Sequence, residues 1–372
     1  MREVSADDIA SRRLAAHGLL RPAGATAADI VRSMGAVQAQ DSLAAKWALG
    51  VRLPAAASRE TAVDEALAQG SILRVHALRG TWQLVAPEDV RWILALVGPR
   101  VIARSARRFR QLGLDEETFR RCRSVLEKTV GRREALTRDE LRAAFAAARI
   151  DASKERLSFI LGRAELDGVL CSGPLRGRKP TWALLDRWAP PPPRSLAGPA
   201  AGAIDRSAAI AELARRYFTT RGPAALDDFV WWSGLTIAEA RAGLDDVKAS
   251  LVAETFAGRT MWRTDRRAQK MPSPSVHLLP AFDEYFVAYR HRDAVVPPGQ
   301  ARRLNAGGGM LSPAVIVDGK IAGVWRRALG PKQTVVVTTS LFAPLSADQR
   351  AGVAEATRRY AQFLGRDLRQ AP

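Results

Sequence analysis

The segment Leu136-Thr137-Arg138-Asp139-Glu140 opens the part of the sequence that decides the fold. Thr137 suits a helix N-cap, and Glu140 stands three residues later, where a capping box places its carboxylate. A helix is therefore predicted from here to about residue 149. A second helix is predicted from residue 153 to Gly168, because apolar residues recur at helical spacing. Its apolar positions are Leu157, Ile160, Leu161, Ala164 and Leu166.

Two strand-like runs follow the second helix, residues 169–172 and 181–185. The loop between them carries the basic residues Arg176, Arg178 and Lys179. Two helices followed by a hairpin with a basic tip are typical of a winged helix-turn-helix unit.

The same order of elements is predicted twice more. Near the N-terminus, helical stretches at 5–18, 25–36, 42–49 and 59–69 precede strand-like residues 72–76 and 81–85, with a turn at Arg79-Gly80. Farther along the chain, helices at 206–218, 226–232 and 237–244 precede a hairpin that turns at Ala257-Gly258. Such a repeat predicts three tandem winged helix-turn-helix units.

The last hundred residues have a different pattern, with β-branched segments around an Asp318-Gly319 turn of the type I′ kind. They predict a small β-barrel-like domain, closed by a helix at 346–364. The proline run at 189–194 cannot be a helix and is interpreted as a stiff linker. We predict a mainly α fold with β-hairpins (α+β) in four segments: 1–133, 134–190, 191–272 (linker and third winged helix) and 273–372.

The charge balance indicates a polyanionic partner. The chain has 372 residues, 57 of them basic and 38 acidic, for a net charge of +19. Residues 1–190 hold 32 basic and 22 acidic residues and the remainder 25 and 16, so the excess spans both halves. Nucleic acid is the expected partner, although an Arg-rich composition also follows from a GC-rich genome.

Other compositional features restrict the location of the protein. No apolar run is long enough to cross a membrane, and the N-terminus lacks the apolar core of a secretory signal. Two cysteines are too few for a disulfide framework or a four-thiolate zinc site. We expect a monomeric cytoplasmic protein associated with the nucleoid and no membrane.

Two groups of residues are predicted to contact DNA phosphates. Arg100, Arg104, Arg107 and Arg108 share one face of a predicted helix and form a basic ridge. Arg176, Arg178 and Lys179 occupy the tip of the second hairpin, where charges reach a DNA backbone easily. Either group could instead be an ordinary solvated surface.

The sequence lacks most of the motifs that mark metal, nucleotide or nucleophilic sites. The four histidines lack metal-ligand spacing, and no glycine-rich phosphate loop or nucleophile elbow is present, so no metal or cofactor is expected. Trp231 and Trp232 are interpreted as core residues. The segment Val37-Gln38-Ala39-Gln40-Asp41 has two amides that could position a water or simply cap helices.

Five segments together resemble the AlkZ-like (YcaQ-like) family of winged-helix DNA glycosylases. They are Gln38-Ala39-Gln40, Leu78-Arg79-Gly80-Thr81-Trp82, residues 227–235 (Asp227 to Leu235), residues 278–285 (Leu278 to Tyr285), and Val317-Asp318-Gly319-Lys320 with Trp325-Arg326-Arg327. They occur in family order and span nearly the whole chain. No single segment is specific for this family, but the five segments together, in the same order, are.

The resemblance implies cleavage of the glycosidic bond of N-alkylated purines in double-stranded DNA, including bulky or crosslinked N7-alkylguanine. Gln38 and Gln40 match the family's catalytic Gln-x-Gln motif, of the branch associated with self-resistance to DNA-alkylating natural products. Arg79, Gly80 and Thr81 correspond to its DNA-probing hairpin. Gln83 stands where many relatives have His, which leaves open an inactive paralogue that still binds damaged DNA.

The expected mechanism needs little acid catalysis, because an N7-alkylated guanine is already cationic. Gln38 and Gln40 are predicted to hold a water and to stabilise an oxocarbenium-like sugar. Asp41 is either a base or a helix cap. Lys46, as a solvated helix residue, is not expected to form a Schiff base, so the predicted enzyme is monofunctional. The alternative is a non-enzymatic DNA-binding protein or transcriptional regulator.

Overall fold

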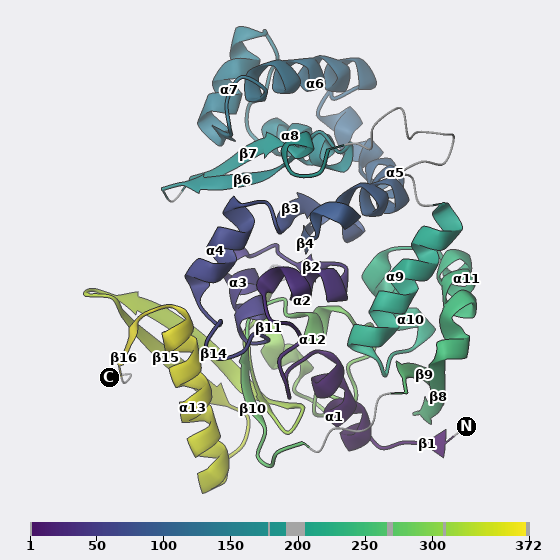
Figure 1. Ribbon diagram of the computed structural model, residues 1–372, viewed down its shortest axis with the longest axis vertical. Coiled ribbons are helices and arrows are strands. Elements are labelled where there is room, and N and C mark those ends of the chain that lie inside the picture. Colours follow the sequence, from purple (N-terminus) through teal and green to yellow (C-terminus); the bar gives the residue numbers. More distant parts are fainter. Residues whose placement is uncertain (1, 178, 191–204, 266–270, 308–309, 370–372) are drawn as a thin grey trace. The chain divides into compact units, whose positions relative to one another are not determined.

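The computed structural model describes residues 2–177, 179–190, 205–265, 271–307 and 310–369 (Figure 1). It divides into two compact units. The first unit comprises residues 1–64 and 210–372, and the second comprises residues 65–209. The predicted linker at 189–194 and the triple glycine at 307–309 fall mostly outside the described residues.

The N-terminal part of the first unit consists of short, well-capped helices. They are α1 (Ala6–Ala16), α2 (Ala27–Met34) and α3 (Ser42–Gly50), followed by α4 (Glu60–Ala68) at the boundary with the second unit. Ser5 with Asp8 and Thr26 with Asp29 form capping boxes at the starts of α1 and α2. Each box satisfies two otherwise free N–H groups, that of the N-cap residue and that of the third helical residue, which helps to define where the helix begins.

A second helical group contains α9 (Arg206–Arg221), α10 (Leu226–Ser233) and α11 (Ile237–Val247). It belongs to the first unit from residue 210 onward. The strands β8 (Leu251–Phe256) and β9 (Arg259–Thr264) follow, and β1 (Arg2–Glu3) pairs with β8 in parallel. Ala257 and Gly258 both have positive φ, of 48° and 74°, so the predicted turn is confirmed.

Only one of the two adjacent tryptophans of α10 is a core residue. Trp232 is buried, but the prediction is wrong for Trp231, whose exposed fraction is 46%. Successive helix residues point about 100° apart, so one face of α10 cannot bury both rings.

A five-stranded sheet forms the C-terminal part of the first unit. Its strand order is β10 (Val276–Leu279), β13 (Ala314–Val317), β14 (Lys320–Gly330), β15 (Thr334–Leu341) and β16 (Asp367–Arg369). Asp318 and Gly319 have φ of 50° and 81°, so the expected type I′ turn joins β13 to β14. Helix α13 (Ala347–Phe363) lies on this sheet, so close that a Cβ on Gly352 would stand 2.6 Å from Val276 (Figure 1). The β-rich character predicted for this region is confirmed.

Short elements complete the first unit: β2 (Val37–Gln38), α12 (Glu284–Val287), β11 (Asn305–Gly307) and β12 (Met310–Leu311). Single 3-10 turns lie at 248–250 and 301–304.

The second unit contains residues 136–185, for which two helices and a hairpin are predicted. Helices α7 (Arg138–Ala147) and α8 (Arg156–Leu166) are followed by β6 (Leu170–Arg176) and β7 (Lys179–Leu184), with β5 (Leu136–Thr137) on the free edge of β7 and a 3-10 turn at 185–187. Thr137 and Glu140 form the predicted capping box. The predicted order of helix, helix and hairpin is therefore present.

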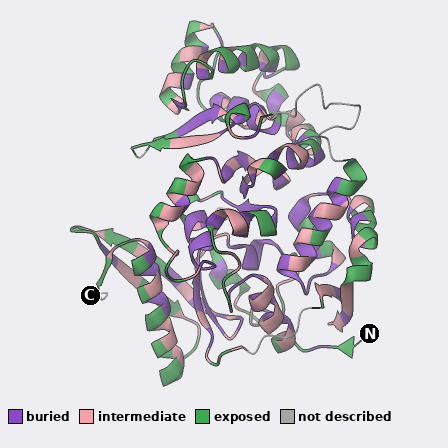
Figure 2. Ribbon diagram, viewed as in Figure 1, coloured by how far each residue is buried: buried purple, intermediate pink, exposed green. Residues whose placement is uncertain are grey.

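The rest of the second unit packs around the same core. Strands β3 (Leu73–His76) and β4 (Trp82–Val85) form a hairpin, and α5 (Pro87–Gln111) and α6 (Glu116–Val130) follow it. Phe109, Phe119, Phe145 and Trp182 belong to one buried cluster that joins α5, α6, α7 and β7. Figure 2 shows the exposed residues of α6 and α7 on the side of each helix that faces away from this cluster.

Within the described part of the chain, no helix has the length and apolar character needed to cross a membrane.

His277, on β10, is a buried histidine in the first unit. Its Nε2 lies 3.0 Å from the Ser275 hydroxyl, and its exposed fraction is 6%. Burial, with a smaller effect of Arg359 and Arg52, lowers the pKa of His277 to about 4. The unfolded chain therefore binds a proton below about pH 6.5 that the folded chain does not.

We predict that stability is lost as the pH falls from 6.5 towards 4, and that His277→Gln reduces this loss. Since the unfolded state is favoured by about 1.4 kcal/mol per pH unit in this window, wild type should lose about 2 kcal/mol more than the variant by pH 5. Urea unfolding at pH 7.5 and pH 5 measures the difference. The half-exposed His291→Gln serves as the control, and equal losses in all three proteins would contradict the prediction.

Candidate active site

The Gln-x-Gln segment lies between α2 and α3 in the first unit. Gln38 is the last residue of β2 and is buried, whereas Gln40 is exposed because the chain leaves the strand at Ala39. The side-chain oxygen of Gln38 accepts a hydrogen bond from the Ala39 N–H at 3.1 Å. One amide is thus anchored in the fold and the other reaches solvent.

Asp41 directly follows the motif and is the N-cap of α3. Its Oδ1 accepts hydrogen bonds from the Leu43 and Ala44 N–H groups, both at 3.0 Å. Of the two roles considered for Asp41, helix capping is therefore confirmed.

A buried carboxylate fixes the backbone at Gln38. Oε1 of Glu284 accepts the Gln38 N–H at 2.8 Å. Oε2 of Glu284 accepts from Nε of Arg221 at 2.9 Å, from Nη2 of Arg221 at 2.8 Å and from the Trp232 indole at 2.9 Å. Arg221 also donates to the carbonyls of Met34 at 2.9 Å and Ala36 at 2.7 Å. The Arg221–Glu284 pair therefore holds the chain before the motif, through Arg221, and the backbone of Gln38, through Glu284.

A second buried ion pair positions the neighbouring chain. Nη1 and Nη2 of Arg52 bind the two oxygens of Asp283 at 2.8 and 2.7 Å, and both side chains are almost fully buried. Arg52 also donates to the carbonyls of His17 and Ala48. Asp283 is the N-cap of α12, which carries Glu284.

These anchors position the motif, and no role was predicted for them from the sequence. Asp283 and Glu284 lie between Phe282 and Tyr285, in an otherwise apolar run. Two acids in such a run signal buried charges that need partners. The sequence therefore indicates that Asp283 and Glu284 are buried and paired, but it does not identify Arg52 and Arg221 as their partners.

The hairpin that the sequence matched to a DNA probe belongs to the second unit. Arg79 and Gly80 form its tip with φ of 58° and 79°. A Cβ on Gly80 would stand 2.9 Å from Val101, so the tip lies against α5 and requires glycine. Gln83 is buried on β4, and its side-chain N–H donates to the Thr81 hydroxyl at 2.9 Å.

Glu165, at the end of α8, is the buried carboxylate of the second unit. Its Oε2 accepts from the His76 backbone N–H at 2.8 Å and the Trp82 indole at 3.1 Å, and lies 2.7 Å from Nδ1 of His76. Its Oε1 accepts from the Trp182 indole at 2.8 Å. One side chain therefore joins the β3–β4 hairpin to β7.

The predicted basic ridge lies on the C-terminal half of α5. Arg104, Arg107 and Arg108 are exposed, and Arg100 is half-buried. Arg108 forms an ion pair with Glu155 and a hydrogen bond with Gln111 at 3.0 Å. Among the described residues, Arg104 and Arg107 form no ion pair, so their charges are the more available ones.

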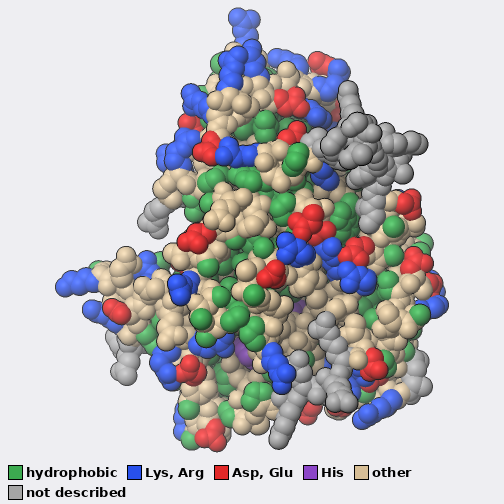
Figure 3. Space-filling view, viewed as in Figure 1, with side chains coloured by type: hydrophobic (Ala, Val, Ile, Leu, Met, Phe, Trp, Pro, Cys, Tyr) green, Lys and Arg blue, Asp and Glu red, His purple; other side chains and the backbone are tan. Residues whose placement is uncertain are grey.

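The tip of the β6–β7 hairpin is less basic than its sequence implies. Nη1 of Arg176 lies 2.8 Å from both oxygens of Glu140, and Nη2 donates to the Ala135 carbonyl at 2.7 Å. Hydrogen bonds from the Thr137 backbone, and then from Arg176, lower the pKa of Glu140 to about 2. Lys179 is exposed, and Arg178 lies outside the described residues. Figure 3 shows further basic side chains over α6 and α7 and on the β14–β15 hairpin.

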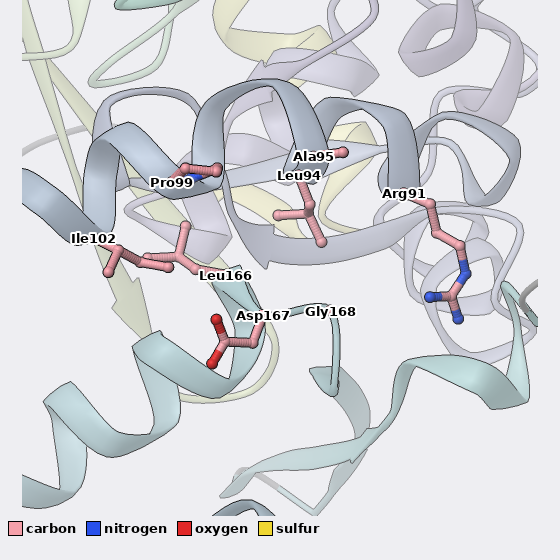
Figure 4. Close-up of a pocket in the computed structure, with 8 residues that line it drawn as sticks. All are labelled: Arg91, Leu94, Ala95, Pro99, Ile102, Leu166, Asp167 and Gly168. Atoms are coloured by element: carbon pink, nitrogen blue, oxygen red, sulfur yellow. The ribbon is translucent and has the colours of Figure 1, made fainter. Parts of the chain in front are cut away.

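A cavity of about 260 Å³ lies in the second unit between α5 and the end of α8 (Figure 4). Leu94, Ala95, Pro99 and Ile102 form its α5 wall. Its two charged groups are already bound, Arg91 to the Ala189 carbonyl and Asp167 to Arg163. This cavity therefore offers apolar surface without a reactive group. Throughout the described ranges, no three His, Cys, Asp or Glu side chains are grouped to hold a metal ion.

Known proteins are similar to this chain over most of its length. Residues 31–363 match the family described as DNA glycosylase AlkZ-like. An interstrand DNA cross-link repair glycosylase of Streptomyces sahachiroi is 28% identical over 321 residues, which cover 81% of this chain and 82% of that protein. The solved structure of the Streptomyces sahachiroi DNA glycosylase AlkZ has a TM-score of 0.73 at 22% identity, covering 99% of this chain and 100% of that one.

The Arg221–Glu284 pair yields a stability prediction. Glu284→Gln keeps the shape but leaves the buried Arg221 charge without its counter-ion, so we expect a loss of about 3–5 kcal/mol of unfolding free energy. Urea unfolding measures it.

The matched control is Asp245→Asn, which breaks the pair with Lys248, where both side chains are 53% exposed. Its cost should stay below about 1 kcal/mol. Similar costs for the two substitutions would show that the Arg221–Glu284 pair does not anchor the fold.

Proposed function

Because this chain belongs to the AlkZ-like DNA glycosylase family, we propose that it hydrolyses the N-glycosidic bond of N-alkylated purines in double-stranded DNA. The substrate we infer is a bulky or crosslinked N7-alkylguanine, in DNA repair or in self-resistance to alkylating natural products. The relative named as an interstrand cross-link repair glycosylase supports this substrate class. The observation that carries the proposal is the Gln-x-Gln segment, held by the Arg221–Glu284 pair with Gln40 exposed.

Catalysis in this proposal is mainly electrostatic. The alkylated base leaves without a proton, so the enzyme must stabilise positive charge on the sugar and supply a water. The carbonyl oxygens of Gln38 and Gln40 provide dipoles and hydrogen-bond acceptors for both tasks. The anchored backbone supports this role, because a preorganised dipole needs no reorganisation during the reaction.

A water nucleophile makes the proposed enzyme monofunctional. Lys46 is the lysine nearest to the motif in sequence. The expectation that it is solvated is wrong, because its side chain is buried, with Nζ 3.1 Å from Glu60 and 2.6 Å from Asp64. An amine held between two carboxylates inside the fold is not available to attack the sugar.

We also propose that a monomer binds the duplex through the second unit, with Arg104 and Arg107 as the principal phosphate contacts. Arg79, Gly80, Thr81, Arg100, Arg108, Arg176, Arg178 and Lys179 are proposed as further contacts. The three winged helices and the four segment boundaries stay predictions of the same kind.

The catalytic roles of Gln38 and Gln40 can be tested by substitution. Gln38→Ala should abolish release of 7-methylguanine and of a bulky N7-guanine adduct from a defined duplex, and Gln40→Ala should reduce it strongly. DNA affinity should be unchanged, because the Gln38 N–H still binds Glu284. Base release by chromatography and binding by fluorescence anisotropy measure the two effects.

Full activity in both variants would rule out the assigned roles. Tight duplex binding by a wild type that releases no base would instead indicate a non-enzymatic DNA-binding protein.

The role of the basic ridge on α5 can be tested through the salt dependence of DNA binding. Replacing Arg104 and Arg107 with Gln should weaken binding to any duplex sequence and reduce the slope of log K against log salt by about 0.9 for each lost phosphate contact. Titrations at several salt concentrations measure the slope. Arg123→Gln is the control, because Arg123 on α6 is exposed but paired with Glu127 at 2.8 Å. A slope equal to that of the control would remove Arg104 and Arg107 from the DNA-binding surface.

A further inference from the structure

A small cavity of about 80 Å³ opens beside the Gln-x-Gln segment, within the first unit. Its lining includes Asp41, Trp47, Pro280, Trp325, Arg327 and Tyr360. Three segments far apart in the sequence thus meet at one cavity: the residue after Gln40, the start of the run that holds Asp283 and Glu284, and the middle of β14.

The aromatic side of this cavity is rigid. The Tyr360 ring makes edge contacts with Trp47 at 5.1 Å and Trp325 at 4.9 Å between centroids. The indole N–H of Trp47 donates to the Leu278 carbonyl at 2.7 Å, and that of Trp325 to the Leu279 carbonyl at 2.8 Å. All three side chains are buried, so the cavity exists before any ligand binds.

Two opposite charges line the cavity without neutralising one another. Asp41 uses Oδ1 for the cap of α3, and among the described residues no hydrogen bond reaches its Oδ2. Arg327 contacts the Tyr360 hydroxyl through Nη1, and no carboxylate in the described chain pairs with it. The cavity therefore offers a free acceptor and free donors to a ligand that has a donor and an acceptor on one edge.

We propose that this cavity recognises the Watson–Crick edge of the target guanine, an inference that rests on the proposed function. The N1–H group of guanine donates to Oδ2 of Asp41, and O6 accepts from Arg327. In adenine the N1 acceptor would face the Asp41 carboxylate, and the 6-amino donor would face the Arg327 guanidinium. Neither pair could form a hydrogen bond. Asp41 and Arg327 thus determine a preference for guanine, and the aromatic rings supply the apolar contact that a base extruded from the duplex requires.

The size of the cavity fits one edge of the base. A cavity of about 80 Å³ is too small to enclose a whole purine, so the imidazole half of the base stays at the mouth. N9, which bears the glycosidic bond, then lies on the side of Gln40, the neighbour of Asp41. N7 also stays outside, so its substituent is not limited by the cavity. This arrangement accommodates bulky N7 adducts.

The test uses the full chain and has a readout that does not depend on catalysis. Calorimetry measures the affinity for free 7-methylguanine, and release assays compare 7-methylguanine with 3-methyladenine from the same duplex. Asp41→Asn keeps a good helix cap but places an amide NH2 where Oδ2 stood, so a donor faces the N1–H group of guanine. Asp41→Asn and Arg327→Gln should each weaken 7-methylguanine binding about tenfold, the loss of one hydrogen bond to a charged group, and should lower the ratio of guanine to adenine release.

The control is Arg326→Gln, an exposed neighbour on the alternate face of β14. Affinities and release ratios equal to this control would overturn the inference, while base release by wild type would still support the proposed function. If wild type releases no base, the proposed function fails, and the calorimetry alone decides: tight 7-methylguanine binding lost in both variants supports the cavity assignment, and no binding overturns it.

Discussion

The buried ion pair between Arg221 and Glu284 is the constraint on which the candidate active site depends. Removing two charges from water is costly, and their mutual attraction repays that cost only when the remaining donors and acceptors are satisfied. Here Glu284 accepts from Arg221, Trp232 and the Gln38 N–H, and Arg221 donates to two carbonyls of the chain before Gln38. A displacement of this chain would leave a charge unsatisfied, so the Gln-x-Gln segment has one favourable position.

Two other buried carboxylates, Asp283 and Glu165, also hold separate elements together, each with a different set of donors. Arg52 and Asp283 form a bidentate pair that sets the start of α12, and so the position of Glu284 itself. In the second unit the buried acid is Glu165, whose donors are the indoles of Trp82 and Trp182 and the backbone of His76. Both units thus use a buried carboxylate to join elements that hydrophobic contacts alone would leave free to slide.

The count of 57 basic residues overstates the number of cations available to a ligand. Many arginines are occupied within the fold: Arg13, Arg52 and Arg221 are buried, and Arg163 and Arg176 are paired with Glu116 and Glu140. Exposed arginines of α5 without a carboxylate partner are few by comparison. A basic composition therefore has two functions in this chain, since some arginines hold the architecture together and others remain for an anionic partner.

The sequence by itself determined the local elements. The capping box of Thr137 and Glu140, the type I′ turn at Asp318-Gly319 and the two hairpin turns at Arg79-Gly80 and Ala257-Gly258 follow from residues within four positions of each other, and their physics is local. The resemblance of five short segments also gave the family. Only the tertiary structure decided which side chains meet. Glu284 and Gln38 are 246 positions apart, and Arg52 and Asp283 are 231 apart, so no periodicity or spacing could pair them. Asp41 and Arg327 line one cavity only because tertiary packing brings α3 and β14 together. Packing also decides that Trp232 is buried and Trp231 is exposed.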